Sequence, residues 1–502
     1  MSEHAPLEIS LHPPNIAGQR AEFHWTESRP SGLYQTTGFW IDFPASVPLQ
    51  TVPESLWWSI FMLCLHAHWT LLRPCRIRLP VRLQPGERAL WQRLMRRHAD
   101  TLDSLNPGRS LPDEMVIEEG AIEIFPPPPR TIPVQCAMAY SGGKDSLSHV
   151  GLLGEMGFKP ILVSTTSVMP GVRLEASTYR ARALHEVQRR RHLELVEVSS
   201  NFRANWHNLL PREWGYRLSL NEITDTLLYT AVLAIVGYAR GATHLFLASE
   251  NEVSANAVVD GVFLQHSHFM YSGLTQAIIS KILKPFGLWY GSLTSSLQSS
   301  LVQELVSRRY PDLSDLQCSC WRGTETRKAC SNCSECRRLA LVSLACGGSP
   351  VDLGVDMIHL LKHYRARLAS RDRTYPHPPD REAAQCFRLQ YARAIRAITP
   401  WKMLRYLLRK HPGGLRNGSL LGAWGEYRKL YATTLADFPE APEPAGYRAG
   451  FLYAMPDVIR SRLEPVLAHQ FPAAPDQEYA NQLDQLKAAI CNSTLDSALD
   501  AG

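Results

Sequence analysis

The sequence lacks the marks of a secreted, disulfide-stabilised or repetitive chain. Its first residues, Met1–Pro6, show no basic segment leading into an apolar run, so we expect no secretory signal and a cytoplasmic protein. Eleven cysteines in 502 residues are too few for a disulfide scaffold, and no internal repeat or low-complexity tract occurs. We therefore expect a globular protein that depends on a hydrophobic core.

A membrane-spanning run and a strong net charge are also missing. The longest apolar stretch, Leu56–Leu72, contains serine, threonine and two histidines, which favours a buried helix and no membrane partner. The formal net charge of +6 is modest for this length, so composition alone demands no nucleic-acid partner. With 45% hydrophobic and 20% charged residues, the chain can bury a full core in about two to four structural units.

Changes of pattern along the chain predict three regions. Residues 1–125 combine strand-like pieces with the apolar helix and are expected to form an N-terminal accessory α+β domain. Four prolines, Pro126–Pro129, then predict a stiff linker. Residues 132–346 follow as the central domain, and residues 350–502 are expected to form a basic, helical C-terminal region.

The central domain is predicted to be α/β, with a doubly wound parallel sheet. From Ile132 onward, short apolar runs alternate with helical segments, as such a sheet requires. The expected strands are Val134–Ala139, Pro160–Ser164, Leu193–Val198 and His244–Ala248, and the expected helices are Ser146–Met156, Thr178–His192 and Asn221–Arg240. In a sheet of this kind, ligands bind beyond the C-terminal ends of the strands.

The segment Ser141–Ser146, with the sequence SGGKDS, lies between the first expected strand and the first expected helix. Gly142 and Gly143 allow the backbone to approach an anion closely and to take positive φ angles. The hydroxyls of Ser141 and Ser146, with the free amides of the first helical turn, can hold phosphate oxygens at the positive end of the helix dipole. The segment does not match the Walker A pattern. It predicts a phosphate-binding loop of another kind.

Four cysteines are spaced for a metal site: Cys320, Cys330, Cys333 and Cys336 form the pattern C-x9-C-x2-C-x2-C. Four thiolates close together favour Zn²⁺ in a closed, structural site, because no coordination position stays open for water. An iron–sulfur cluster is the chemical competitor. Cys318 is a fifth nearby thiol, which we expect to be a bystander.

The loop resembles the S-G-G-x-D-S motif of the N-type ATP pyrophosphatases, which have an adenine nucleotide α hydrolase-like fold. These enzymes adenylate an acyl or amide-like oxygen and release pyrophosphate. The resemblance implies ATP as a substrate, with Asp145 helping to hold Mg²⁺, Ser146 holding phosphate and Lys144, at a variable position, contacting phosphate. It also implies that Ser164 and Thr165 contact adenine.

Both motifs together resemble 7-cyano-7-deazaguanine synthase, the queuosine-pathway enzyme, over about residues 132–345. That family has S-C-Y followed by C-x2-C-x2-C and a basic residue, where this chain has Ser319-Cys320-Trp321, its three further cysteines and Arg337-Arg338. The resemblance implies that the carboxylate of 7-carboxy-7-deazaguanine attacks the α-phosphate of ATP. Ammonia then displaces AMP to give an amide, and a second ATP-driven step dehydrates the amide to the nitrile.

Polar residues near the expected strand ends and helix starts are candidates for gripping the deazapurine base. They are Asn221, Glu222, Glu250, Asn251 and His266. Each is also a plausible helix cap or structural polar residue. Their positions make them secondary candidates beside the phosphate loop.

The chain departs from a stand-alone synthase, which would end near the cysteine cluster. The part after the cluster is basic between Lys362 and Arg416, with only Asp372, Asp380 and Glu382 as acids. Extended proteins of this kind resemble those of anti-phage defence operons, including type IV CBASS and Qat systems. In such a protein the acceptor amine is either ammonia or an amine on a protein or nucleic acid. The basic region between Lys362 and Arg416 is either a binding site for RNA, DNA or an acidic partner, or a solvated helical face. A homodimer is also open.

Two other functions remain open at this point. One is a tRNA-modifying sulfur transferase, because such enzymes share the SGGKDS motif and carry cysteine pairs. In that case one cysteine would be a reactive persulfide carrier, or the cluster would hold iron and sulfur. The other is a non-catalytic nucleotide-sensing or zinc-stabilised module within a complex. Asp145→Ala separates the second from an enzyme, since a sensing module has no turnover to lose.

Overall fold

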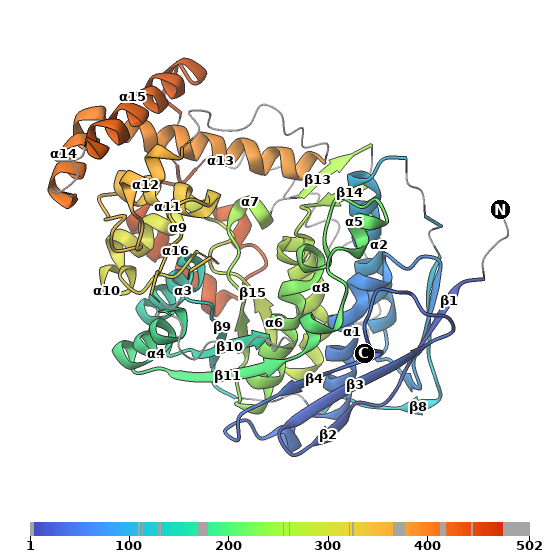
Figure 1. Cartoon of the computed structure of the whole chain (residues 1–502). Helices are drawn as coiled ribbons and strands as arrows, with labels where there is room; N and C mark the ends of the chain where they lie inside the picture. Colours follow the sequence, from blue (N-terminus) through green and yellow to red (C-terminus); the bar gives the residue numbers. More distant parts are fainter. Residues whose placement is uncertain are drawn as a thin grey trace.

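The computed structural model describes residues 5–474, apart from 109–110, 113, 129, 131, 168–178, 255, 261, 321, 324–325, 365–376, 412–417 and 443–444. The side chains of Ser167, Asn221, Glu222 and Asp225 also lie outside the description. Within these bounds the molecule is built on one eleven-stranded sheet with helices on both faces (Figure 1).

Five parallel strands make up one half of the sheet. In spatial order they are β15 (Trp289–Gly291), β12 (His244–Phe246), β9 (Cys136–Ala139), β10 (Ile161–Ser167) and β11 (Glu194–Ser200). Since β9 is the first of them in the chain, the strand order reverses between β9 and β12. A doubly wound sheet offers its ligand crevice at this switch point.

Alternating side chains of these strands enter two separate cores. Ala137, Ile161 and Val163 pack on one face, against α1 (Glu54–Trp69), α6 (Leu220–Ala239) and α8 (Gly273–Leu283). Met138 and Leu162 pack on the other face, with α3 (Lys144–Glu155), α4 (Tyr179–Arg191) and α9 (Ser299–Glu304). Because both faces are covered, the strands are apolar throughout rather than alternating.

The expected α/β class and mostly parallel sheet are confirmed, and all four expected strands and three expected helices lie within a few residues of their predicted bounds. The finer assignment to the adenine nucleotide α hydrolase-like fold stays a prediction. The apolar run Leu56–Leu72 forms most of α1, which is almost entirely buried, as expected.

The N-terminal region continues the same sheet instead of building one of its own. β4 (Gly38–Asp42) pairs antiparallel with β11, and β3 (Arg20–Glu27), β1 (Leu7–Leu11), β5 (Cys75–Arg78) and β7 (Met115–Glu118) follow in spatial order. Its α1 packs against α6, so one hydrophobic core extends across the predicted boundary at residue 125. The boundary itself stays a prediction.

The remaining elements are short strands and peripheral helices. The short strands are β2 (Asn15–Ala17), β6 (Val81–Arg82), β8 (Ile122–Glu123), β13 (Asn256–Val259) and β14 (Val262–Gln265). The helices are α2 (Glu87–Leu105), α5 (Leu210–Glu213), α7 (Asn251–Ser254), α10 (Pro311–Ser314), α11 (Ser334–Ala345), α12 (Met357–Lys362), α13 (Pro378–Ala397), α14 (Pro400–Lys410), α15 (Ser419–Asp437) and α16 (Asp457–Gln470).

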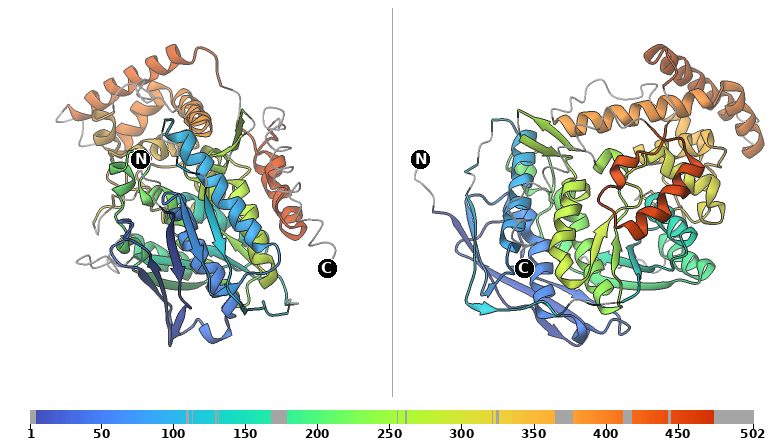
Figure 2. Two further views of the ribbon diagram at one scale, coloured as in Figure 1. Left: turned by 90° about the vertical axis from the view of Figure 1, so that its right-hand side faces the viewer. Right: turned by 180° about the vertical axis from the view of Figure 1, so that it is seen from behind.

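The described part of the C-terminal region divides between two places. Helices α12 to α15 pack with α11 around a third core that contains three of the four clustered cysteines. Helix α16 returns to the central sheet and packs beside α3, where Arg462 donates a hydrogen bond of 3.0 Å to the carbonyl of Met156. Figure 2 shows α14 and α15 at the periphery and α16 against the central body. Among the described helices, none combines the length and apolar character needed to cross a bilayer.

Candidate functional site

The predicted phosphate loop connects β9 to α3 at the switch point of the sheet. Gly142 has a φ of +74°, in the left-handed region that glycine tolerates best. Ser146 donates to the carbonyl of Gly143 at 3.1 Å. The amide of Leu147 donates to the carbonyl of Gly143 at 3.0 Å, and in the described chain it is the first amide of α3 that donates to a backbone carbonyl. The amides before it lie at the positive end of the helix dipole, which suits an anion.

A large cavity of about 910 Å³ opens at the C-terminal ends of the parallel strands. Ser141, Asp145 and Ser146 of the loop line it, with Ser164 and Thr165 from the middle of β10, which extends to Ser167. The volume falls within the range of about 300–1,000 Å³ that small-ligand sites occupy. The predicted phosphate loop and the predicted adenine contacts therefore face one cavity.

Lys144 does not point into this cavity as a free phosphate contact. Its ammonium group is buried and donates to Asp145 Oδ1 at 2.5 Å and to Glu250 Oε1 at 3.1 Å. Glu250 follows the C-terminal end of β12, on the other side of the switch point. The lysine therefore bridges the phosphate loop and the neighbouring strand end.

The two carboxylates differ in their pKa because their surroundings differ. Burial and the nearby Glu250 charge raise the pKa of Asp145 to about 7, against the opposing effect of Lys144. Burial also acts to raise the pKa of Glu250, but the charges of Lys144 and Arg338 outweigh it and lower that pKa to about 2. Asp145 is thus the carboxylate whose charge depends on what binds beside it.

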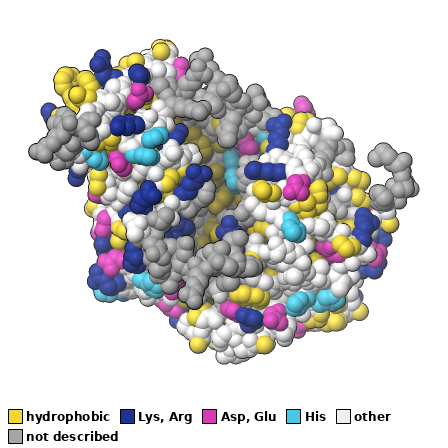
Figure 3. All heavy atoms as spheres, viewed as in Figure 1, with side chains coloured by type: hydrophobic (Ala, Val, Ile, Leu, Met, Phe, Trp, Pro, Cys, Tyr) yellow, Lys and Arg dark blue, Asp and Glu magenta, His cyan; other side chains and the backbone are white. Residues whose placement is uncertain are grey.

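A second, smaller cavity of about 400 Å³ adjoins the first. Asp145 lines both cavities, and so do Thr226, Ala248 and Tyr271. The residues that line only the smaller cavity are Glu250, Val253, His268, Met270, Arg338 and Phe387. A recess with hydrophobic side chains inside and Lys or Arg at its rim opens near the middle of the face in Figure 3.

Helix α13, from the C-terminal region, supplies one wall of the smaller cavity. Phe387 lies on this helix, and the guanidinium carbon of Arg338 lies 4.8 Å from the centre of its ring. Gln390 of the same helix donates to Glu252 and accepts from the amide of Ser300 at 2.8 Å. The C-terminal region is therefore part of this cavity and not only an appendage.

The four predicted metal ligands converge on one point. The sulfur atoms of Cys320, Cys330, Cys333 and Cys336 all lie within 4.8 Å of one another, and the closest pairs are 3.5, 3.8 and 3.9 Å apart. Sulfurs about 2.3 Å from a tetrahedral zinc ion lie about 3.8 Å from each other, so the set fits Zn²⁺. Cys318 is not a member of the group.

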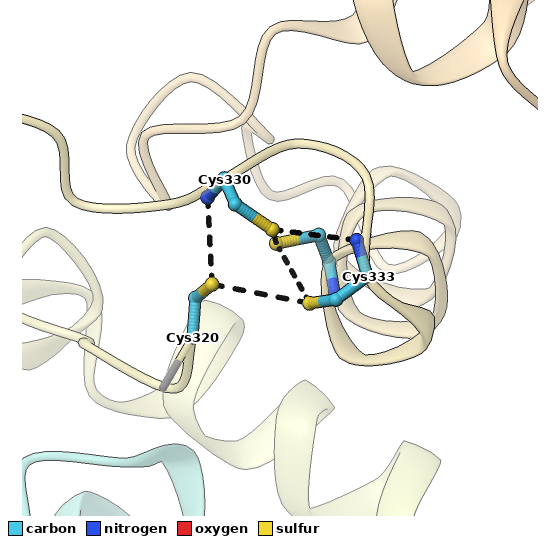
Figure 4. A group of neighbouring side chains, drawn as sticks. Cys320, Cys330 and Cys333 are labelled. Atoms are coloured by element: carbon cyan, nitrogen blue, oxygen red, sulfur yellow. Dashed lines mark hydrogen bonds between the residues drawn. The ribbon is translucent and has the colours of Figure 1, made fainter. Parts of the chain in front are cut away.

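Backbone amides support the thiolates of this cluster. The N–H group of Cys330 points at the sulfur of Cys320 at 3.4 Å, and that of Cys333 points at the sulfur of Cys330 at 3.3 Å (Figure 4). The N–H group of Cys336 points at the sulfur of Cys333 at 3.4 Å. For Cys330, burial raises the pKa, but the amides of Asn332 and Cys333 and the neighbouring thiols outweigh it and lower the pKa to about 7. Burial raises the pKa of Cys333 and Cys336 in the absence of an ion. Thiolates are the form that binds metal, so the amide contacts favour a loaded site.

The segment that leads into the cysteine cluster is bonded directly to the phosphate loop. The amide of Cys318 donates to the carbonyl of Gly142 at 2.7 Å, and the amide of Lys144 donates to the hydroxyl of Ser319 at 3.1 Å. Gln317 donates to the same hydroxyl at 3.0 Å. Two motifs far apart in sequence therefore form one connected site.

The secondary base-binding candidates have different positions. Asn221 and Glu222 lie on the first turn of α6, but their side chains lie outside the described part. Glu250 lines the smaller cavity. Asn251 is buried and donates to the carbonyl of Ser295 at 3.0 Å, and it lines neither cavity.

His266 also lines neither cavity. Its Nδ1 accepts from the amide of His268 at 3.1 Å, and its Nε2 lies 3.4 Å from Asp380 on α13. Its neighbour His268 is the histidine that lines the smaller cavity.

Sequence reasoning missed most of the smaller cavity. Thr226, which lines both cavities, follows Glu222 on α6 by four residues, so helical periodicity could have identified it as a candidate. Arg338 stood in the quoted motif but had no assigned role. Phe387 and His268 carried no local signal, because only the packing of α13 and of the segment after β14 brings them to the site.

Comparison with known proteins assigns no relative to this chain. No protein-family model, no curated protein and no solved structure matches it. Any function must be argued from the residues and their geometry.

Proposed function

We propose that this protein uses ATP to activate the carboxylate of a 7-deazaguanine acid, such as 7-carboxy-7-deazaguanine, and transfers the acyl group to an amine. The observation that carries the proposal is the position of Asp145, in the wall shared by the two cavities. A group there can act on the phosphates of a nucleotide in one cavity and face an acid in the other.

The larger cavity suits the nucleotide. The amides of Asp145 and Ser146 in the first turn of α3 and the hydroxyl of Ser141 are donors for phosphate oxygens, and the hydroxyl of Ser146 joins them if it turns away from the carbonyl of Gly143. Ser164 and Thr165 of β10 can contact the adenine. Asp145 would hold a Mg²⁺ ion, which when bound neutralises charge on the departing pyrophosphate.

The smaller cavity suits a flat, anionic acid. The positive charge of Arg338 favours a carboxylate, and the ring of Phe387 offers a surface for a heteroaromatic base. Arg338 is held in place by Glu335, 2.5 Å away on the same helix, so its orientation is set before the acid binds. Thr226 and Tyr271 add hydroxyl groups where the two cavities meet.

The reaction then follows from the placement of the two ligands. A carboxylate oxygen attacks the α-phosphorus, the bond to the β-phosphate oxygen breaks, and pyrophosphate leaves. The amine attacks the acyl carbon, AMP leaves with the bonding electron pair, and the amine proton passes to solvent. Holding both reactants in adjoining cavities supplies much of the rate, since it removes their translational freedom.

The cysteine geometry does not favour a sulfur transferase. A persulfide carrier needs an accessible thiol with a lowered pKa. The pKa of Cys330 is lowered to about 7, but its sulfur lies 3.8 Å from that of Cys336 within the converging group of four. Burial raises the pKa of the nearby Cys318 thiol. The cluster fits a structural zinc better, and a colourless, zinc-containing protein is the expected preparation.

The test is to incubate the protein with ATP, Mg²⁺ and 7-carboxy-7-deazaguanine, with and without ammonia, and to identify the products by mass spectrometry. We expect AMP and pyrophosphate only when the acid is present, and an amide or nitrile when ammonia is added. Formation of ADP and phosphate, or an equal rate of AMP formation with and without the acid, would overturn the proposal.

Asp145→Asn provides the matched variant. We expect pyrophosphate release to fall about 100-fold or more, because the ion that neutralises the leaving group loses its ligand. Asp312→Asn is the control, since Asp312 is an aspartate on α10 that pairs with Arg191. Normal turnover in Asp145→Asn, or an equal loss in the control, contradicts the assigned role.

A further inference from the structure

Helix α14 displays an aromatic and basic surface that no part of the proposed reaction uses. Its members are Trp401, Lys402, Arg405, Leu408 and Arg409, which we call the Trp401 face. They share one side of the helix because they follow one another at intervals close to whole turns. The tryptophan is 74% exposed and Leu408 is 39% exposed.

The rest of α14 is fixed to the molecule, so the Trp401 face is presented rigidly. Met403 and Leu407 point the other way, into the core shared with α13 and α15. Thr399 caps the helix, Trp424 of α15 donates to the carbonyl of Pro400 at 3.0 Å, and the rings of Trp401 and Trp424 lie 6.4 Å apart. Figures 1 and 2 both show α14 at the outer edge of the molecule.

The charge of the Trp401 face is of one sign. Helix α14 contains no acidic residue, and in the described part of the chain neither Arg405 nor Arg409 forms an ion pair. The nearest acid along α15, Glu426, pairs with Lys429 at 2.7 Å. Lys402 donates to the carbonyl of Ala397 at 3.0 Å, which leaves its charge without an acidic partner among the described contacts. A flat, exposed ring beside cations that no described acid neutralises is therefore the feature that needs an explanation.

We propose that the Trp401 face binds single-stranded nucleic acid, with a base stacked on Trp401 and phosphates held by Lys402, Arg405 and Arg409. Such a strand repeats both of the required features, an aromatic plane and a negative charge. An acidic peptide supplies the charge but no regular ring for the tryptophan. A membrane surface would need a wider apolar face than Trp401 and Leu408 expose, because Met403 and Leu407 are buried in the protein core and Leu404 is partly buried against it.

The test measures the binding of a fluorescently labelled 20-nucleotide oligothymidylate and its RNA counterpart to the full-length protein by anisotropy, at 50 and 200 mM salt. We expect binding that weakens with salt. Trp401→Ala should weaken it about tenfold or more, because stacking contributes about 1–3 kcal/mol per base. The double variant Arg405→Glu, Arg409→Glu should weaken binding further. It should also reduce the slope of log affinity against log salt concentration by about two, because two phosphate contacts are lost.

The control reverses two charges elsewhere, Arg189→Glu with Arg460→Glu, on the exposed sides of α4 and α16. It changes the net charge equally, and we expect less than a twofold effect. Thermal unfolding of each variant checks that it folds. No binding by the wild type, an equal loss in the control, no effect of Trp401→Ala, or equally tight binding to polyglutamate or anionic vesicles would each overturn the inference. The readout is binding alone, so the result does not depend on the proposed enzymatic activity.

Discussion

The hydroxyl of Ser319 accepts a hydrogen bond of 3.1 Å from the amide of Lys144, at the first turn of α3. Ser319 directly precedes Cys320, a ligand of the candidate metal centre, and Lys144 belongs to the phosphate loop. The contact links the two motifs mechanically. It suggests that the metal centre holds one side of the phosphate loop in place.

Ser319→Ala tests this link. The variant loses the acceptor for the Lys144 amide, so we expect ATP affinity to fall by about threefold to tenfold, as for one net hydrogen bond. Zinc content should stay at the wild-type level, because the cysteines are unchanged. Calorimetric titration with ATP measures the affinity, and Ser314→Ala, on α10, is the control. Unchanged ATP affinity with normal zinc would show that the contact does not position the loop.

Cys333→Ser should release the metal and lower the melting temperature. Three of the four ligands belong to the hydrophobic core built by α11 to α15, so losing the ion loosens that core. We also expect weaker ATP binding, transmitted through residues 318 and 319. Metal analysis of the purified protein and a thermal melt are the measurements. Cys346→Ser, outside the cluster, should behave as the wild type, and a Cys333→Ser protein with full metal content would refute the site.

Lys144→Met should destabilise the fold by about 1–3 kcal/mol, since the half-buried Asp145 and Glu250 carboxylates lose the lysine between them, while Arg338 still offsets the charge of Glu250. Glu250→Gln alone should cost less, because the Lys144–Asp145 pair remains. In the double variant, the second substitution should add little to the first. Urea unfolding of the wild type, the two single variants and the double variant gives the double-mutant cycle. Strictly additive losses would mean that Lys144 does not couple to Glu250.

Stability should fall as the pH falls from about 6.5 toward 3, in part through His149. Burial lowers the pKa of His149 to about 3, and its Nε2 accepts from the amide of Leu293 at 3.2 Å. The unfolded chain therefore binds a proton in this range that the folded chain does not, so the unfolding free energy rises with pH.

His149→Gln keeps an acceptor but does not titrate. We expect its unfolding free energy to depend less steeply on pH, by up to about 1.4 kcal/mol per pH unit between pH 4.5 and 6. Urea unfolding at several pH values measures the slope. The exposed His12→Gln is the control. An unchanged slope in His149→Gln would mean that His149 is charged in the folded protein.

Local patterns in the sequence were sufficient for four of the five parallel strands, β15 being missed, and for locating both motifs. Apolar runs and helical spacing are properties of neighbouring residues, so β9 to β12 and α3, α4 and α6 could be located without tertiary information. The four cysteines lie within seventeen residues, and their convergence followed from spacing alone. The closed set of thiols was therefore predictable.

The sequence by itself determined the loop Ser141–Ser146 at the start of a helix and the four cysteines of the candidate metal centre, because both depend on short stretches of chain. Only the tertiary structure decided that Ser319 contacts Lys144, that Lys144 joins Asp145 to Glu250, and that Phe387 closes the smaller cavity. These contacts join residues 106 to 175 positions apart or bring in a distant helix. Such contacts arise from the packing of whole elements, which no local pattern encodes.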